Sequence, residues 1–250
     1  MRPSRAKLGL LVLAFLPSFI ALPAVAQDAT PGGEGSGVTI LSADEPYADV
    51  DRGEWYARYL QWAVSVPMAV NPLFDPDGNG CEIGQAGPVF FVPFSYVQES
   101  VTIPCVVPEG TAIFVGVAVV ECSTVEAPPF FGRDEAELRA CAAAATDGIT
   151  NLQASVNGVA VPDLEQYRAP TPLFPMNLRA DNFFGVEPGV ALSVGDGYSF
   201  IIAPPPPGTY QVVVSGTFSD GAPFTGTAQI TVQTAQVVEP PASPAASPVT

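Results

Sequence analysis

Short apolar runs divided by glycine and proline turns cover most of this chain. Runs of this length that are rich in Val, Ile and Phe predict β-strands. We expect strands at residues 89–97, 101–107, 112–120, 152–156, 159–161, 190–194, 198–203, 209–218 and 225–233. Asn157-Gly158 is a strong hairpin signal, because both central residues of a type I′ turn need positive φ. Many short strands predict a mainly β fold: an antiparallel β-sandwich, jelly-roll or immunoglobulin-like, or else a barrel.

Two segments depart from the strand pattern and predict short helices. Residues 49–66 form the first, because Trp55, Tyr59 and Trp62 recur at helical spacing and Pro67 follows. Residues 134–146 form the second, where acidic residues open a run of alanines. We therefore expect a sandwich with two short helices.

The first helix carries four aromatic residues, and two interpretations of them stay open. They are a platform on which sugar rings stack, or they are large side chains that pack the helix against the sheet, which we favour. The residues are Trp55, Tyr56, Tyr59 and Trp62. Tyr56 and Arg58 lie off the main apolar face, so we expect them to form a ligand-binding surface if the helix has one.

The first residues are typical of an export signal. Basic residues precede an apolar segment at 8–20, and Ala24-Val25-Ala26 is a small-residue cleavage site. The apolar run is too short for a membrane anchor, which needs roughly 20 residues. We therefore expect a secreted chain with a signal peptide at 1–26, a flexible linker at 27–37, one domain at 38–238 and a disordered Pro/Ala/Ser tail at 239–250.

The charge of the chain excludes several partners and chemistries. Nine basic residues stand against 25 acidic ones, a net charge of −16, and cleavage of the signal would remove Lys7, the one lysine. We expect no nucleic-acid partner and no membrane partner after cleavage, because both need clustered cations. The absence of His excludes Ser-His-Asp and Cys-His catalysis. An enzyme on this chain would need carboxylates, Tyr, Arg or a bound metal.

Four cysteines in an exported chain predict two disulfides, and four cysteines allow three pairings. We favour Cys81 with Cys105 and Cys122 with Cys141, because each pair closes a short loop. On the second helix, Leu138, Cys141 and Ala145 share a face, so the second bridge would fix that helix to the sheet. A redox or metal-binding thiol is the alternative, but no C-x-x-C motif supports it.

The segment Asp75-Pro76-Asp77-Gly78-Asn79-Gly80 resembles the first half of a calcium loop. Oxygen ligands alternate along it at Asp75, Asp77 and Asn79, so calcium is the one cofactor that the sequence suggests. The carboxylate that should close such a loop is replaced by Ala86. The alternative is a tight turn of Asp, Asn and Gly that leads into Cys81.

Two aromatic loops and four loop acids complete the candidate chemistry. The loops at 125–132 and 183–185 form a binding surface if exposed or close the ends of the sandwich if buried, which we favour. A glycosidase needs two carboxyl groups at a set separation. The candidates are Asp75, Asp77, Asp181 and Asp196.

A set of residues spread over 55–214 resembles a family of secreted bacterial proteins with no established activity. The set is Trp55, Trp62, Pro67, Asn71-Pro72, Asp75, Cys81, Gly84-Gln85, the run at 87–91, Cys105, Pro108, Gly110, Glu121-Cys122, Asp196-Gly197-Tyr198 and Pro207-Gly208. The resemblance implies an exported bacterial origin and one continuous domain. It implies no site residues.

We therefore expect a secreted, non-enzymatic binding or structural module that engages a carbohydrate, another envelope component or a protein ligand. The alternative is a carboxylate-dependent hydrolase such as a glycosidase, with or without calcium support. Buried Trp55 and Trp62 would favour the module, whereas an open groove with two acids and exposed aromatics would favour the enzyme.

Overall fold

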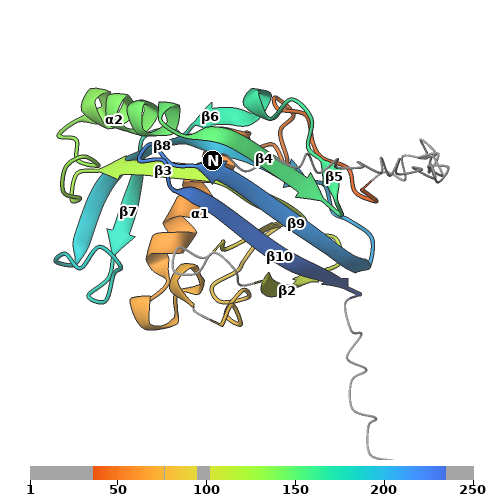
Figure 1. Ribbon diagram of the computed structural model, residues 1–250. Coiled ribbons are helices and arrows are strands. Elements are labelled where there is room, and N and C mark those ends of the chain that lie inside the picture. Colours follow the sequence, from red (N-terminus) through yellow and green to blue (C-terminus); the bar gives the residue numbers. More distant parts are fainter. Residues whose placement is uncertain (1–35, 76, 95–101, 235–250) are drawn as a thin grey trace, which may run out of the picture. The chain divides into compact units, whose positions relative to one another are not determined.

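A computed structural model describes residues 36–75, 77–94 and 102–234, which all belong to one compact unit (Figure 1). The expected signal peptide, nearly all of the linker and the C-terminal tail lie outside the described residues. Among the helices of the described part, none has the length and apolar character needed to cross a membrane.

Ten strands form two five-stranded sheets, which confirms the predicted β-sandwich. Sheet 1 contains, in order, β1 (Val89–Phe91), β3 (Ala112–Ser123), β8 (Gly189–Ile202) and β6 (Arg168–Pro170), and β7 (Phe174–Leu178) also pairs with β8. Sheet 2 contains β2 (Thr102–Pro108), β10 (Pro223–Gln233), β9 (Gly208–Thr217), β4 (Thr150–Val156) and β5 (Val159–Ala160). Most pairings are antiparallel, but β1 with β3 and β2 with β10 are parallel.

Strand β8 is one continuous strand, where the sequence pattern predicted two. Gly195 and Gly197 suggested a break, but both lie within the strand and allow close packing instead. A Cβ atom on Gly195 would lie 2.8 Å from Leu60 Cδ1, and one on Gly197 would lie 2.2 Å from the carbonyl oxygen of Ala118. Glycine is therefore needed here because α1 and β3 approach the backbone of β8 closely.

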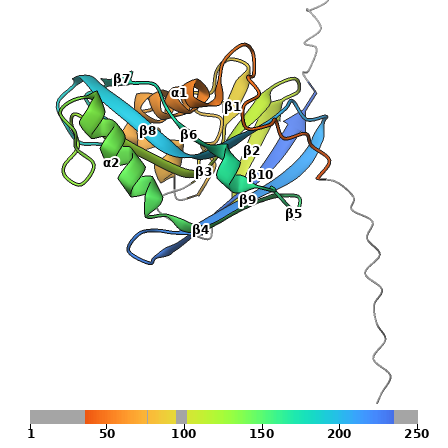
Figure 2. The same cartoon turned by 90° about the horizontal axis from the view of Figure 1, so that it is seen from above.

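Sheet 1 lies between two apolar layers. One face packs against sheet 2, and the other packs against helix α1 (Arg52–Ser65), as Figure 2 shows from above. Trp55, Tyr59 and Trp62 are at most 6 % exposed, and the Tyr59 ring stacks on Phe114 at 5.3 Å between centroids. The core interpretation of these aromatic residues is therefore confirmed.

Strand β3 changes register against β8 between Gly116 and Ala118. Before this bulge, Ile113 and Val115 pack into the core between the sheets. After it, Val119 packs on the α1 side and Cys122 packs on the opposite side. The bulge thus reverses which residues face each layer, because side chains alternate along a strand with a period of two.

The Tyr56 hydroxyl is inserted between β3 and β8 at this bulge. It accepts a hydrogen bond from Val120 N–H at 2.7 Å, and it lies 2.8 Å from the Val120 carbonyl oxygen and 3.1 Å from that of Asp196. Tyr56 is fully buried, so the prediction that it forms a ligand-binding surface is wrong. The reason is that its hydroxyl hydrogen-bonds with backbone groups of β3 and β8, at Val120 and Asp196 beyond the bulge.

Both favoured disulfides are confirmed. Cys81 lies 5.3 Å from Cys105 and Cys122 lies 6.2 Å from Cys141, measured between Cα atoms. The second bridge joins β3 to helix α2 (Glu135–Asp147), whose Leu138 and Ala142 pack around it. Helix α2 thus lies on the opposite side of β3 and β8 from α1 (Figure 1).

We predict that Tyr56→Phe destabilises the fold by about 1–3 kcal/mol, because Val120 N–H then lacks its acceptor in a buried position. Thermal unfolding followed by circular dichroism measures this as a lower melting temperature. Tyr47→Phe is the matched control, since the Tyr47 hydroxyl makes no hydrogen bond within the described residues. Equal melting temperatures for the two variants would contradict the role of the Tyr56 hydroxyl.

Candidate functional site

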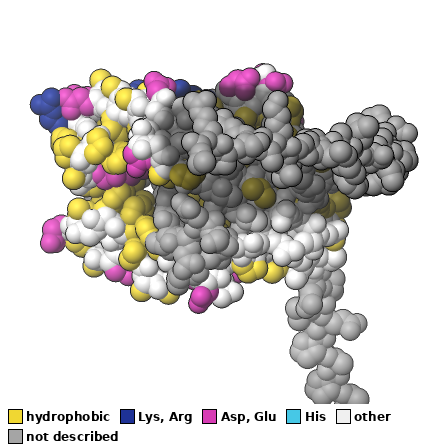
Figure 3. All heavy atoms as spheres, viewed as in Figure 1, with side chains coloured by type: hydrophobic (Ala, Val, Ile, Leu, Met, Phe, Trp, Pro, Cys, Tyr) yellow, Lys and Arg dark blue, Asp and Glu magenta, His cyan; other side chains and the backbone are white. Residues whose placement is uncertain are grey.

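A cavity of about 800 Å³ follows β3 from Gly116 to Glu121. Residues of α1 such as Leu60 line one side, and Phe218 and Phe224 at the β9–β10 hairpin line the other. Because β3 residues directed to both faces of sheet 1 contribute to the lining, the cavity extends around the edge of this strand. In Figure 3 hydrophobic side chains gather around a hollow at the left of the visible face.

The position of the cavity follows from the short pairing of β1. Among the described strands, β1 pairs with β3 only over Ala112–Phe114, whereas β3 continues to Ser123. The bulge begins just beyond this pairing, where a Cβ on Gly116 would lie 2.5 Å from Val119 Cγ2. The second half of β3 therefore presents its outer edge to the cavity instead of to another described strand.

The lining is strongly aromatic. Seven phenylalanines contribute to it: Phe74, Phe94, Phe130, Phe183, Phe184, Phe218 and Phe224. Among the lining residues that the structure describes, Glu121 and Glu126 are the only charged ones. The described part of the lining is thus apolar, with a single acidic position.

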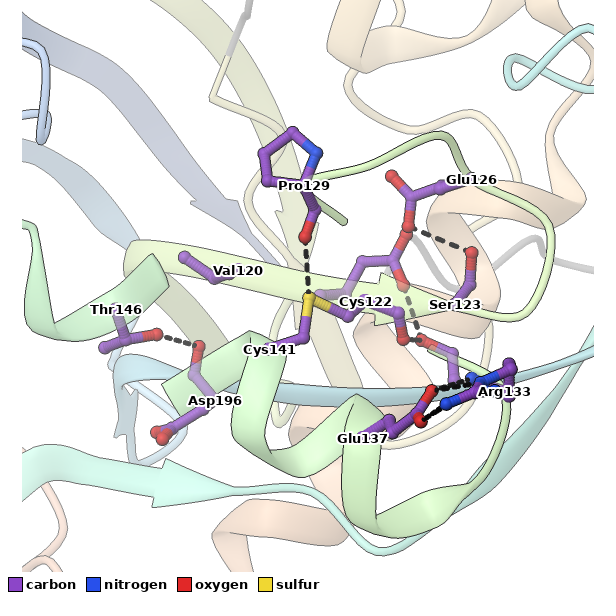
Figure 4. The surroundings of a disulfide bond; sticks show 12 residues. Val120, Cys122, Ser123, Glu126, Pro129, Arg133, Glu137, Cys141, Thr146 and Asp196 are labelled. Atoms are coloured by element: carbon purple, nitrogen blue, oxygen red, sulfur yellow. Dashed lines mark hydrogen bonds and ion pairs between the residues drawn. A yellow bond between two sulfur atoms is a disulfide. The ribbon is translucent and has the colours of Figure 1, made fainter. Parts of the chain in front are cut away.

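Glu121 and Glu126 form an interacting carboxyl pair, in which each group affects the pKa of the other. Glu121 lies near the end of β3, and Glu126 lies in the loop that follows it. The Ser193 hydroxyl oxygen of β8 lies 2.5 Å from Glu121 Oε2, and Ser123 donates to Glu126 Oε2 at 2.9 Å. Figure 4 shows Glu126 turned toward Ser123, beside the disulfide of Cys122.

Both carboxyl groups are harder to ionise than an ordinary glutamate. Burial raises the pKa of Glu121 well above its usual value, and the nearby charge of Glu126 raises it further. Burial is also the largest cause of the raised pKa of Glu126. Two like charges at this separation disfavour each other in a poorly solvated site, so the pair holds a proton where exposed carboxylates have lost theirs.

The contacts of Ser193 agree with a protonated pair. Its hydroxyl oxygen lies 2.5 Å from Glu121 Oε2 and 3.0 Å from the Cys122 carbonyl oxygen. A hydroxyl group has one proton, and a carbonyl oxygen can only accept. Both contacts are satisfied together when Ser193 donates to Cys122 and a protonated Glu121 donates to Ser193.

The residues predicted to bind calcium form a turn away from the cavity lining. Asp75 Oδ1 accepts from Asp77 N–H at 3.0 Å, and Asp75 Oδ2 accepts from Gly80 N–H at 2.7 Å. Within the described residues, no three His, Cys, Asp or Glu side chains gather as metal ligands. The geometry therefore favours the alternative of a tight turn, and Asn79 belongs to the same turn.

None of the four loop acids proposed for a glycosidase lines the cavity. Asp196 is 8 % exposed and forms an ion pair with Arg168 at 2.9 Å, and Asp181 lies 3.9 Å from Arg179. Neither of them, nor Asp75 or Asp77, lines the cavity. The acidic pair that does line it was not among the predicted residues.

Arg58 and the aromatic loops have mixed positions. Arg58 is partly exposed, pairs with Glu54 at 3.3 Å, and lies 4.6 Å from the Trp55 ring centroid. Phe130 and Phe131 are about two-fifths exposed, and Phe183 and Phe184 are partly buried. Three of these phenylalanines, all except Phe131, line the cavity, so the loops form part of its wall.

Sequence reasoning missed Glu121 and Glu126 although one signal was present. Glu121 follows directly on the apolar run at 112–120, and Cys122, a predicted disulfide partner, comes next. A carboxyl group between a buried strand and a bridged cysteine is close to the protein interior, where a charge is costly. The register shift that directs it into the cavity has no comparable signal in the sequence.

Comparison of the chain with protein-family models, with curated proteins and with solved structures finds no match. The resemblance to secreted bacterial proteins therefore stays an expectation. The functional proposal is based on the geometry of the cavity.

We predict that Glu121→Gln flattens the fall of stability with rising pH above about 4.5. A raised pKa means that the folded chain holds a proton that the unfolded chain has lost, so wild-type stability falls by up to about 1.4 kcal/mol per pH unit in that range. Glutamine mimics the protonated acid and removes this loss. Urea unfolding at several pH values measures it.

Glu137→Gln is the control for this prediction. Its carboxyl group is fully exposed, and Arg133 lowers its pKa to about 2, so its contribution is lost only as the pH falls below the usual value. This variant should keep the wild-type slope above pH 4.5. An unchanged slope in Glu121→Gln would contradict the protonated pair.

Proposed function

We infer that this protein is a non-enzymatic binding module whose cavity takes an apolar small molecule. The observation that carries this proposal is the cavity of about 800 Å³ lined by phenylalanines, with one polar pair. Cavities for small ligands in proteins typically have volumes of about 300–1,000 Å³, mostly apolar walls and a few convergent polar groups. The burial of Trp55 and Trp62 also supports a module over an enzyme.

The chemistry of the lining favours an apolar ligand over a carbohydrate. A sugar needs a hydrogen-bond partner for most of its hydroxyl groups, because unpaired polar groups are costly to bury. Only a few described lining residues carry polar side chains, among them Glu121, Glu126 and Ser219. The aromatic residues of α1 pack into the core, as we favoured, and do not form the alternative platform for stacking sugars.

The disulfides support an extracytoplasmic location for this module. All four cysteines of the chain are paired, and structural disulfides persist in oxidising compartments. The export signal expected at residues 1–26 agrees with this location. A secreted binder of apolar molecules would carry a poorly soluble compound through water.

A carboxylate-dependent hydrolase is the second candidate, and the Glu121–Glu126 pair is the observation that favours it. Two carboxyl groups that share a proton can act as general base and general acid. The four acids proposed for a glycosidase do not line this cavity, so a glycosidase is disfavoured. Cleavage of an ester or peptide substrate that is lost in Glu126→Gln would support the hydrolase over the module.

We predict that the protein enhances the fluorescence of Nile red, a neutral apolar dye, and that Ala145→Trp weakens this binding by about tenfold or more. Ala145 of α2 lines the cavity, so an indole ring there occupies its volume.

Ala144→Trp is the matched control, because Ala144 is the preceding residue of the same helix, is exposed and does not line the cavity. It should bind the dye like the wild type. Equal affinities of the two variants, or no binding by the wild type, would contradict the proposed site.

A further inference from the structure

The Glu121–Glu126 pair gives the cavity one polar end, which limits the class of ligand that the cavity can bind. We propose that the ligand is an amphiphilic amine, with its ammonium group at Glu121 and Glu126 and its hydrocarbon part against the phenylalanines of the cavity. This inference rests on the proposed function, because it names the ligand class of the same cavity. It stands on three features of the described residues: the charge of the lining, the hydrogen-bonding capacity of the pair and the charge of the chain.

The charge of the lining excludes an anionic ligand. The described lining contains two carboxyl groups and no Arg or Lys, so a fatty acid or a phosphate would meet only like charge. The groups that face the pair from neighbouring elements are the neutral hydroxyls of Ser123 on β3 and Ser193 on β8. Between apolar walls an ammonium group is attracted to a carboxylate more strongly than in water, because the screening is weaker.

The hydrogen bonds of the pair leave room for a cationic donor. The serine hydroxyls contact Oε2 of each glutamate, the Ser123 backbone also hydrogen-bonds Glu126, and the two carboxyl groups interact with each other. A carboxylate offers about four lone-pair positions, and an ammonium group has three N–H donors. An ammonium group can therefore take over the bridging role of the shared proton, which leaves to solvent as the amine binds.

The net negative charge of the whole chain also favours a cationic ligand. A net charge of −16 attracts cations from solution and raises their concentration near the protein. The aromatic rings near the pair add to this, because the face of an aromatic ring attracts a cation. An amine with a long alkyl chain thus matches both ends of the cavity.

Three ligands with ten carbon atoms each separate the contributions: n-decylammonium, 1-decanol and decanoate. We expect calorimetry of the full chain at pH 7 to show decylammonium binding about tenfold or more tightly than decanol, with decanoate the weakest. Glu121→Gln and Glu126→Gln should reduce the preference for the amine over the alcohol to less than about threefold, while decanol binding stays unchanged. Glu109→Gln, an exposed acid at the turn before β3, should leave the preference as in the wild type.

Proton release provides an independent measurement. Repeating the titration in buffers of different ionisation enthalpy should show protons released when decylammonium binds to the wild type and not when decanol binds. Thermal unfolding of each variant confirms that it is folded.

The possible outcomes separate this inference from the proposed function. Equal affinities for decylammonium and decanol would contradict the proposal of an amine ligand. They would leave the proposal of an apolar binding cavity intact. A preference that survives in both glutamine variants would overturn the assignment to this pair. If none of the three ligands and no Nile red bind, both the proposed binding function and the proposal of an amine ligand are contradicted.

Discussion

The change of register in β3 between Gly116 and Ala118 is the constraint on which the rest of the structure depends. One extra residue reverses the direction of every later side chain in the strand. Cys122 consequently faces α2 and can bond to Cys141, whereas Val119 packs on the α1 side. In an unbroken strand Cys122 would face α1, and this bridge to α2 could not form. The Tyr56 hydroxyl hydrogen-bonds with both strands just beyond the bulge, at Val120 and Asp196.

The same bulge connects the fold to the candidate site. It places Glu121 beside the cavity, and the loop that begins after β3 returns Glu126 to it. The disulfide of Cys122 anchors the residue between Glu121 and Ser123, and Ser123 holds Glu126. The raised pKa values therefore follow from backbone geometry, which forces two acids into one poorly solvated place. Such a pair is costly to keep unless a proton or a cationic group lies between its members.

The sequence was most informative where the signal is local. Asn157 and Gly158 both have positive φ, as the predicted hairpin turn requires, and the two short cysteine loops and the apolar face of α1 were also predicted correctly. The sequence-based predictions failed where the role of a residue depends on contacts with residues far away in the chain. Gly195 and Gly197 suggested a break, but their neighbours on α1 and β3 explain them as close contacts. Glu121 could not be paired with Ser193, because only the β3–β8 register brings them together.

The central claim is that β3, through its bulge, builds an apolar cavity whose polar end binds a cationic group. The most direct test is a crystal structure of the protein grown with n-decylammonium. The account predicts the nitrogen atom within hydrogen-bonding distance of both Glu121 and Glu126, and the alkyl chain along the edge of β3 between α1 and the β9–β10 hairpin. A ligand bound elsewhere, or a cavity filled by the protein's own side chains with the two carboxyl groups turned away from it, would contradict the account.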